Sequence, residues 1–365
     1  MLETTALKHL GRGQRLTLVT AVAVTVAAGV TKAAGVAPVP RFVIAGLALA
    51  TLAAVVGQAI EQVGERLGPS ATGLLQSTLG NLPELFVCLF ALSDGLDGVV
   101  RAALVGSVLG NAVLVLGCAF VAGGLRHGPQ KFDPEEPRLN ASLLLLVVAA
   151  LMVPTLASKL GTPAASHTGA LSNACAIVLL VVYAASLPFY LRDRSRDTDR
   201  PDTKVEARAD SEPWPLRLSI GMLTVGSAGA ALAANWFVQP LQEATRSIGI
   251  SETFTGLVIV AIASNAVENA VGIRFALRAK PEYAISTSLN SPLQVALLLT
   301  PVLVLLSSVV GPTKLTLVFP PLLVAALAIS TLVVTVVIYD GEYTWIEGVA
   351  LIGLYVIIAT AFWWG

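Results

Sequence analysis

The sequence predicts an all-helical membrane protein with about eleven transmembrane helices, and three observations lead to this fold class. Apolar residues make up 55% of the 365 residues, charged residues make up 13%, and the mean hydropathy is +0.78. A typical soluble domain carries about twice that share of charge. The apolar residues form repeated blocks of about twenty, which is the length of a helix that crosses a bilayer. Isolated strands cannot satisfy their backbone groups in lipid, so we expect these blocks to be helices.

Eleven blocks are long enough to cross the hydrocarbon layer. The first follows Arg15 and meets Lys32 without a small-residue cleavage site, so we expect a retained span and no cleaved signal peptide. The predicted spans are 16–34, 42–60, 72–94, 99–122, 141–158, 170–191, 215–238, 253–278, 284–309, 317–339 and 344–364.

The lysines and arginines indicate which side of the membrane each loop faces. Of these 23 residues, 17 border the side of the N-terminus and 6 border the opposite side. Cytoplasmic loops carry the excess of positive charge. We therefore expect the N-terminus and the polar linker 192–214 in the cytoplasm and Gly365 outside, in the plasma (inner) membrane. The formal net charge is zero, which gives no basic patch for nucleic acid.

The chain divides into four predicted segments. A tail and first helix cover 1–41, a first five-helix repeat covers 42–191, the linker covers 192–214, and a second five-helix repeat covers 215–365. An odd number of spans in each repeat inverts the second repeat relative to the first. Secondary transporters are often built from inverted repeats, with the ion site where the repeats meet near mid-membrane.

The two repeats carry the same polar motif. Asn81-x-x-Glu84 in the first matches Asn265-x-x-Glu268 in the second, and a serine follows each glutamate by 23 residues. An ionised carboxylate inside a membrane persists only if it is paired, protonated or bound to a cation. No Lys, Arg or His lies at comparable depth in the spans. The motif therefore predicts that Glu84 and Glu268 bind a metal ion or protons.

The neighbouring residues favour a hard cation such as Ca²⁺, which takes six to eight oxygen ligands. No Cys or His accompanies the two acids, which argues against zinc and copper. Without a cation, two close carboxylates cannot both stay ionised, so protons compete with the cation for one site. This competition predicts antiport. The further oxygen donors that we predict are Asn81, Asn265, Ser107, Ser291, Gln294 and Asn111.

Several other residues are candidates for a supporting role. Gly80 and Pro83 flank the first motif and are expected to free backbone carbonyls. Glu61 and Glu65 lie one turn apart at the cytoplasmic end of the second span, where they either face water or give cations and protons access to the site. Asn269 follows the second glutamate directly.

At these residues the sequence resembles the calcium/proton exchanger (CAX) branch of the cation/calcium antiporter superfamily. The stretch from Gly73 to Glu84, followed by Val105 to Asn111, resembles the first α-repeat of the family, and Ser264 to Asn269, followed by Ser291-Pro-Leu-Gln294, resembles the second. The resemblance implies one helix followed by two inverted sets of five, with Glu84 and Glu268 as essential carriers. It also implies export of Ca²⁺ driven by inward H⁺.

Residue by residue, the resemblance places five oxygen donors on family motif positions and likens Glu61 to an acidic position before the first repeat. These donors are Asn81, Asn265, Ser107, Ser291 and Gln294. The chain departs from the family pattern at four positions. Asn269 replaces the usual His, Asn290 replaces Gly, and Gln76 replaces Asn. At the fourth position, Pro83 is similar to the residue of the sodium/calcium exchanger branch.

The sequence leaves rival functions open. Exchange of Na⁺ or K⁺ for H⁺ or Ca²⁺ would use the same two acids. A channel would need a continuous file of polar residues, whereas the polar residues here gather at one depth. We expect no enzyme and no cofactor, because no Ser/His or Asp/Asp nucleophile set lies within the spans. The expected partners are inorganic cations, protons and membrane lipid, and the oligomeric state, a homo-oligomer included, stays open.

Overall fold

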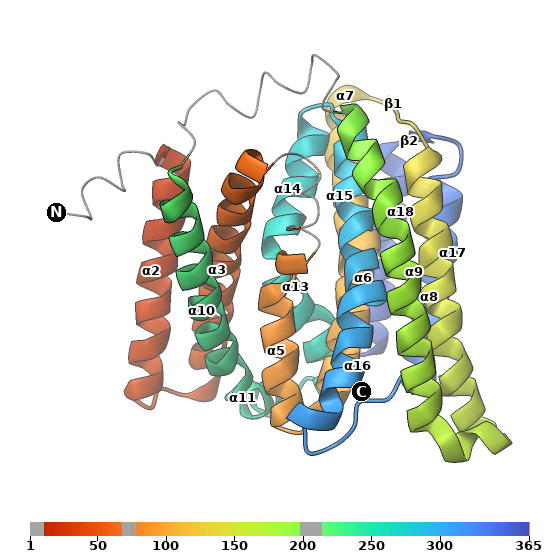
Figure 1. The fold of residues 1–365 in the computed structure, drawn as a ribbon, viewed down its shortest axis with the longest axis horizontal. Helices are drawn as coiled ribbons and strands as arrows, with labels where there is room; N and C mark the ends of the chain where they lie inside the picture. Colours follow the sequence, from red (N-terminus) through yellow and green to blue (C-terminus); the bar gives the residue numbers. More distant parts are fainter. Residues whose placement is uncertain (1–10, 68–74, 76–77, 198–213, 365) are drawn as a thin grey trace. The chain divides into compact units, whose positions relative to one another are not determined.

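The computed structural model describes residues 11–67, 75, 78–197 and 214–364. Helices dominate these residues, as the apolar blocks predict (Figure 1). Within this described part of the chain, seven helices are long and apolar enough to cross a membrane, and an eighth span results if a pair bent by 118° counts as one. The same residues include three shorter apolar helices. An all-helical, multi-pass membrane protein is thus confirmed, and the number eleven stays a prediction.

The chain packs as two compact units. Unit 1 comprises residues 1–87 and 184–244, and unit 2 comprises 88–183 and 245–365. Each unit takes segments from both predicted repeats, so packing divides the chain differently from the repeat pattern. The prediction of two inverted five-helix repeats is not tested by this division. The linker 192–214 falls largely outside the described residues.

Unit 1 is built on three neighbouring helices, α2 (Arg12–Ala33), α3 (Pro38–Leu67) and α10 (Leu216–Val238) (Figure 1). Small residues let α3 and α10 approach closely, because a Cβ added at Gly226 would lie 3.2 Å from Val56. Trp214, at the end of the linker, is 1% exposed. Its backbone N–H donates to the side-chain oxygen of Gln62 at 2.8 Å. Packing thus fixes the point where the linker enters α10.

Unit 2 contains most of the remaining helices. Its α7 (Leu116–His127) packs against α18 (Trp345–Ala361), and α14 (Ala266–Leu277) packs against α15 (Pro281–Gln294) and α7. In the same unit α8 (Glu135–Lys159) packs against α17 (Pro321–Val337) and α15. Two short strands, β1 (Gln130–Lys131) and β2 (Glu342–Tyr343), pair antiparallel. The elements are α6 (Asp97–Leu109), η2 (Gly110–Val115), α7 (Leu116–His127), α8 (Glu135–Lys159), η3 (Pro163–His167), α12 (Glu252–Phe254), η5 (Thr255–Val260), α13 (Ala261–Ser264), α14 (Ala266–Leu277), α15 (Pro281–Gln294), η6 (Val295–Leu299), α16 (Thr300–Val310), α17 (Pro321–Val337) and α18 (Trp345–Ala361).

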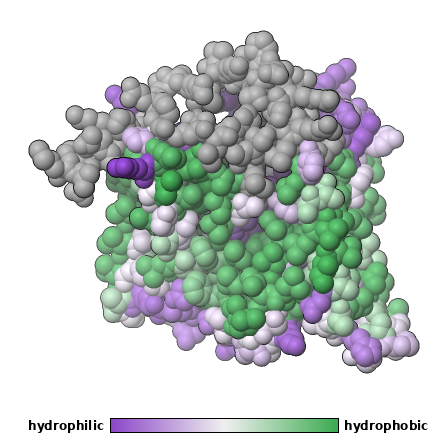
Figure 2. All heavy atoms as spheres, viewed as in Figure 1, coloured by the Kyte–Doolittle hydropathy of each residue, from purple (hydrophilic) through white to green (hydrophobic). Residues whose placement is uncertain are grey.

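Three helices run across the boundaries between the units: α5 (Leu82–Ser93), α9 (Thr168–Asp197) and α11 (Leu241–Ile248). On the face that Figure 2 shows, hydrophobic residues cover most of the surface, and hydrophilic residues gather along its lower edge and at the upper right. Val153 of α8, Val336 of α17 and Ile357 of α18 are 54%, 74% and 69% exposed. A surface of this kind is suited to lipid.

The predicted span 253–278 differs from a single straight helix. It comprises α12, η5 and α13, a turn at Asn265, and then α14. The matching predicted span 72–94 is described only from residue 75, in part, and it contains a turn at residues 80–81 before α5 begins. Both interruptions lie at the Asn-x-x-Glu motifs.

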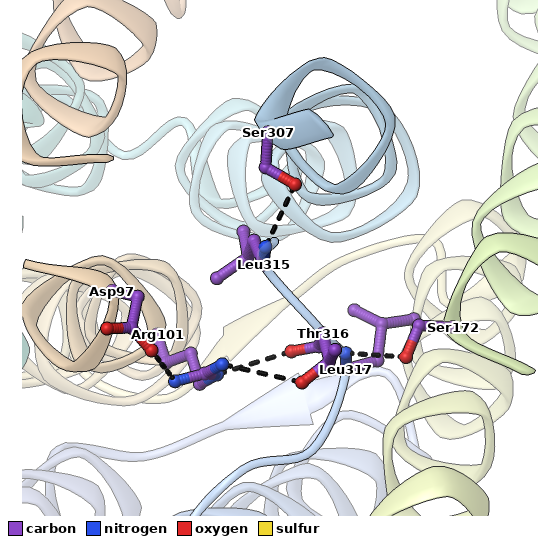
Figure 3. Close-up of polar contacts among 7 residues, drawn as sticks. All are labelled: Asp97, Arg101, Ser172, Ser307, Leu315, Thr316 and Leu317. Carbon is purple, nitrogen blue, oxygen red and sulfur yellow. Dashed lines mark hydrogen bonds and ion pairs between the residues drawn. The ribbon is translucent and has the colours of Figure 1, made fainter. Parts of the chain in front are cut away.

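An extended segment between α16 and α17, residues 311–320, which we call the strap, leaves the helical pattern (Figure 3). Residues 315, 317 and 319 are buried, and they alternate with more exposed ones. Hydroxyl groups from three helices accept their backbone N–H groups. These bonds run from Leu315 to Ser307 (2.9 Å), from Leu317 to Ser172 (2.9 Å) and from Phe319 to Thr155 (3.1 Å).

Arg101 fastens α6 to the strap. Its Nε donates to the backbone oxygen of Thr316 at 3.2 Å, and its Nη2 donates to the Thr316 hydroxyl at 3.4 Å (Figure 3). Its Nη1 forms an ion pair with Asp97 on the same helix. The guanidinium thus joins a helix that carries predicted site residues to a non-helical segment.

A backbone-to-backbone crossing holds α6 against η5. A Cβ added at Gly106 would lie 2.1 Å from the carbonyl oxygen of Leu257, and one added at Gly256 would lie 2.6 Å from that of Val99. Only glycine fits these two positions. Close crossings through small residues are typical of membrane helices, because van der Waals packing drives their association.

We predict that Thr155→Val destabilises the fold. The substitution keeps the shape of the side chain but leaves the buried N–H of Phe319 without its acceptor, which costs about 1–3 kcal/mol. Thermal unfolding of the purified protein in detergent should show a lower melting temperature. The control is Thr224→Val, because the exposed Thr224 hydroxyl donates to Ile220 within its own helix. Equal melting temperatures for the two variants would show that the hydrogen bond from Phe319 to Thr155 does not stabilise the fold.

Gly106→Ala should also destabilise the protein, because the new methyl group collides with the Leu257 backbone. Overpacking of this kind costs about 1–3 kcal/mol. Gly98→Ala on the same helix is the matched control, since no atom lies within 4 Å of the added Cβ. The control should be neutral or slightly stabilising, because alanine favours a helix more than glycine does. A Gly106→Ala variant as stable as the wild type would disprove the tight crossing.

Candidate cation site

In the first motif, Glu84 lies at the start of a helix. Residues 80 and 81 form a turn, α5 begins at Leu82, and the backbone N–H of Leu85 donates to the Asn81 oxygen at 2.9 Å. Glu84 is the third residue of α5 and only 2% exposed. The N-terminal end of a helix carries partial positive charge and stabilises a carboxylate there. The buried position of Pro83 in this first turn suits a residue that has no N–H to donate.

The second motif has the same local structure. Asn265, with φ −107° and ψ 17°, interrupts the helix between α13 and α14, and Glu268 is the third residue of α14. The N–H of Asn269 donates to the Asn265 oxygen at 3.1 Å. The matched letters of the two repeats therefore correspond to matched backbone conformations, each with a glutamate in the first turn after a break.

Two further oxygens of this motif are buried. Glu268 Oε2 and Asn269 Oδ1 are shielded from solvent, and neither has a hydrogen-bond partner among the described residues. A buried polar oxygen without a partner is unfavourable. A cation bound at Glu268 would supply the missing partner, and a proton would remove the cost of the buried charge.

The side chain of Asn265 joins the two repeats within unit 2. Its Nδ2 lies in hydrogen-bonding geometry with Ser107 Oγ of α6, with the Ala261 oxygen at 2.9 Å, and with Ser264 Oγ at 3.2 Å. Ser107 comes from the first repeat, and the other residues come from the second. Ser264 is not among the donors predicted from the sequence, although its place directly before Asn265 is a signal that could have identified it.

Asn111 extends this cluster to α15. Its Nδ2 donates to the Ser107 backbone oxygen at 3.1 Å and to Ser291 Oγ at 3.5 Å. Its Oδ1 is buried, with no hydrogen-bond partner among the described residues. Ser107, Asn111, Asn265 and Ser291 are between 1% and 7% exposed. The structure thus brings four of the predicted oxygen donors together in one buried polar cluster.

Helix irregularities flank this cluster in both repeats. The π-helical segment η2 follows Ser107, and the π-helical segment η6 follows Gln294 directly. Such segments frequently occur at functional sites, because they leave backbone carbonyls outside the regular ladder. Pro292, inside α15, also lacks an N–H to donate. Pro292 therefore leaves one carbonyl of the preceding turn without its helical N–H donor.

The remaining candidates lie as follows. Gln294 is the last residue of α15 and partly buried, and Gly80 lies in the turn before α5. Glu61 is exposed on α3, and the side chain of Glu65 lies outside the described residues. Asn81 and Glu84 belong to unit 1, and Glu268 belongs to unit 2. A site shared by the two glutamates therefore stays a prediction.

The donors in the cluster are amide and hydroxyl oxygens, with the carboxylate of Glu268 one helical turn beyond Asn265. In the described part of the chain, no three His, Cys, Asp or Glu side chains gather as a metal-binding group. Oxygen donors of this kind match the preference of Ca²⁺, Mg²⁺ and other hard cations.

Known proteins share both the sequence and the fold. The calcium/proton antiporter of Synechocystis sp. is 37% identical over 88% of this chain and 90% of its own length. The calcium/proton antiporter ChaA of Bacillus subtilis is 34% identical over 88% of this chain and 91% of its own length.

Solved structures agree with these relatives. The superposition on the structure of native YfkE covers 95% of this chain and 99% of the YfkE chain, with a TM-score of 0.80 and 30% sequence identity. An H⁺/Ca²⁺ exchanger CAX structure covers 96% of this chain and 92% of its own, with a TM-score of 0.73 and 16% identity, which shows the shared fold. The sodium/calcium exchanger protein family matches residues 38–191 and 218–364, almost the whole membrane region. The resemblance found in the sequence is confirmed, and the chain belongs to the sodium/calcium exchanger protein family.

Proposed function

We propose that this protein is a secondary active transporter that exchanges Ca²⁺ for H⁺ across the membrane by alternating access. The observation that carries the proposal is the repeated structure of the two motifs. In each motif the helix is interrupted at an asparagine, and a glutamate stands in the first turn of the helix that follows. The family membership and the names of the relatives favour Ca²⁺ and H⁺ over Na⁺.

The proposed site contains seven residues. Glu84 and Glu268 supply the negative charge, and amide and hydroxyl oxygens complete the shell of a hard cation. The amide and hydroxyl donors are Asn81, Asn265, Ser107, Ser291 and Gln294. Asn111, Asn269, Gly80 and Pro83 support the site, and Glu61 and Glu65 give access to it from the cytoplasm.

Charge neutralisation couples the two ions. One Ca²⁺ or protons neutralise the two carboxylates, whereas the empty ionised site is costly inside the membrane. A site that reorients only when it is neutral carries the cation one way and protons the other. A resident cofactor or an enzymatic reaction has no part in this cycle.

The orientation follows from the charges of the loops. The N-terminus and the linker 192–214 lie in the cytoplasm and Gly365 lies outside, because most lysines and arginines border the N-terminal side. We propose the plasma (inner) membrane as the location, with lipid around the helices. Ca²⁺ leaves the cytoplasm as protons enter.

Purified protein in liposomes should take up Ca²⁺ when the lumen is more acidic than the outside. Parallel assays with Na⁺ and K⁺ under the same pH gradient test the choice of ion, and empty liposomes give the leak. Proton efflux measured with a lumenal dye should rise with added Ca²⁺. Ca²⁺ uptake that does not depend on the pH gradient would refute Ca²⁺/H⁺ exchange. Proton efflux that Na⁺ drives and Ca²⁺ does not would refute it as well.

Glu84→Gln and Glu268→Gln should each abolish exchange, because a neutral amide can neither carry a proton between states nor balance the charge of Ca²⁺. Each variant should still elute as a folded protein in size-exclusion chromatography. Glu135→Gln, an exposed carboxylate at the start of α8, is the matched control and should keep wild-type exchange. Calcium-driven proton flux retained in either motif variant would exclude that glutamate as a carrier.

A further inference from the structure

A second polar cluster lies beside the site in unit 2, between the start of α8 and the middle of α15. The Oε1 atom of Glu136 accepts hydrogen bonds from Ser286 Oγ and from Asn290 Nδ2, both at 3.0 Å. Glu136 is the second residue of α8, where the positive end of the helix favours its charge. A charged acceptor makes both bonds stronger than bonds between neutral groups.

Asn290 uses both ends of its amide in this cluster. Its Nδ2 donates to Glu136 and to Ser286 Oγ at 2.8 Å, and its Oδ1 accepts from Asn140 Nδ2 at 2.9 Å. Asn140 is 0% exposed and lies one turn after Glu136 on α8. Two residues of α8 therefore form hydrogen bonds with opposite ends of one amide side chain of α15.

These hydrogen bonds of Asn290 lie next to the candidate cation site. Asn290 immediately precedes Ser291, whose hydroxyl accepts from Asn111 in the buried cluster. A rotation or shift of α15 large enough to move Ser291 would break the bonds of Asn290 to α8. Amide bonds at both ends of one side chain resist rotation more than a single contact does, because their directions must both be satisfied.

The helix needs external support at this point. Pro292 has no N–H, so the regular helix ladder is incomplete just after Asn290, and η6 begins at Val295. Backbone that departs from the regular pattern is held in place by surrounding contacts. The contacts from α8 supply that support on the N-terminal side of Ser291.

We propose that Asn290 is a positioning residue, clamped by Glu136 and Asn140, that fixes Ser291 in the cation site and raises the affinity of the site for its cation. The clamp acts on the site through α15, mainly at Asn290 and also through the bond of Ser286 to Glu136, without touching the ion. This inference rests on the proposed function. It assigns Glu136 and Asn140 a role in affinity that neither the Asn-x-x-Glu motif nor the residue spacing indicates.

The test compares the apparent KM for Ca²⁺ and the maximal rate in proteoliposomes. Asn290→Ala, Asn140→Ala and Glu136→Ala should each raise the apparent KM about 10-fold, the usual effect of removing a residue that orients a metal ligand. The maximal rate should stay within about twofold, since the carriers themselves are unchanged. Glu136→Gln keeps an acceptor oxygen for Asn290 and should restore most of the affinity.

Glu135→Ala is the matched control, because this exposed carboxylate stands beside Glu136 in the same helical turn. Its apparent KM should equal that of the wild type. The double variant Glu136→Ala with Asn290→Ala should lose less affinity than the two single effects combined, because both changes remove the bond between Glu136 and Asn290. Melting temperatures of all variants, and ⁴⁵Ca²⁺ binding to the detergent-solubilised protein, identify a variant that has simply lost its fold.

Separate results would overturn the inference and the proposed function. The inference fails if wild-type protein exchanges Ca²⁺ for H⁺ and Glu136→Ala retains the wild-type KM. It also fails if the effects of Glu136→Ala and Asn290→Ala add in the double variant, or if the maximal rate falls while KM stays constant. The proposed function fails if the wild-type protein itself shows no Ca²⁺-dependent proton flux.

Discussion

Hydrocarbon offers no hydrogen-bond partner, so every backbone group that leaves the regular helix inside the membrane must be satisfied by the protein. In the second motif Asn265 interrupts the helix, and its side chain bonds to Ser107 and Ala261. Along the strap, the hydroxyls of Thr155, Ser172 and Ser307 do the same for an extended segment. At these two places, side chains stabilise backbone that leaves the regular helix.

The same constraint gives the candidate site its chemistry. Oxygens such as Glu268 Oε2 and Asn111 Oδ1 are buried without a hydrogen-bond partner among the described residues. A bound cation would relieve this cost by supplying positive charge to these oxygens. Each glutamate also stands at the positive end of a helix, which lowers the cost of its charge. Binding and release can then be governed by the balance between the cation and protons.

Much of this arrangement could be predicted from the sequence. Hydropathy predicted helices, because segments that cross lipid must be apolar along about twenty residues. The pairing of Asn-x-x-Glu with a serine 23 residues later selected Ser107, Asn265 and Ser291, which the structure places together with Asn111. The contacts of Gly106 and Asn290 could not be predicted, because their partners, Leu257 and Glu136, are about 150 residues away in the chain. Contacts between residues so far apart in the chain produce no periodic pattern in the local sequence.

The sequence by itself determined that the protein is helical, that it spans a membrane several times, and that two acidic motifs repeat with equal spacing. These properties depend on residue type and local order, which the chain carries directly. Only the tertiary structure decided that both motif helices restart immediately after their asparagines, that α6 touches η5 through glycine, and that α8 grips α15 at Asn290. The physical reason is that these features depend on packing and hydrogen bonds between distant segments, and each bond forms only once the helices have met.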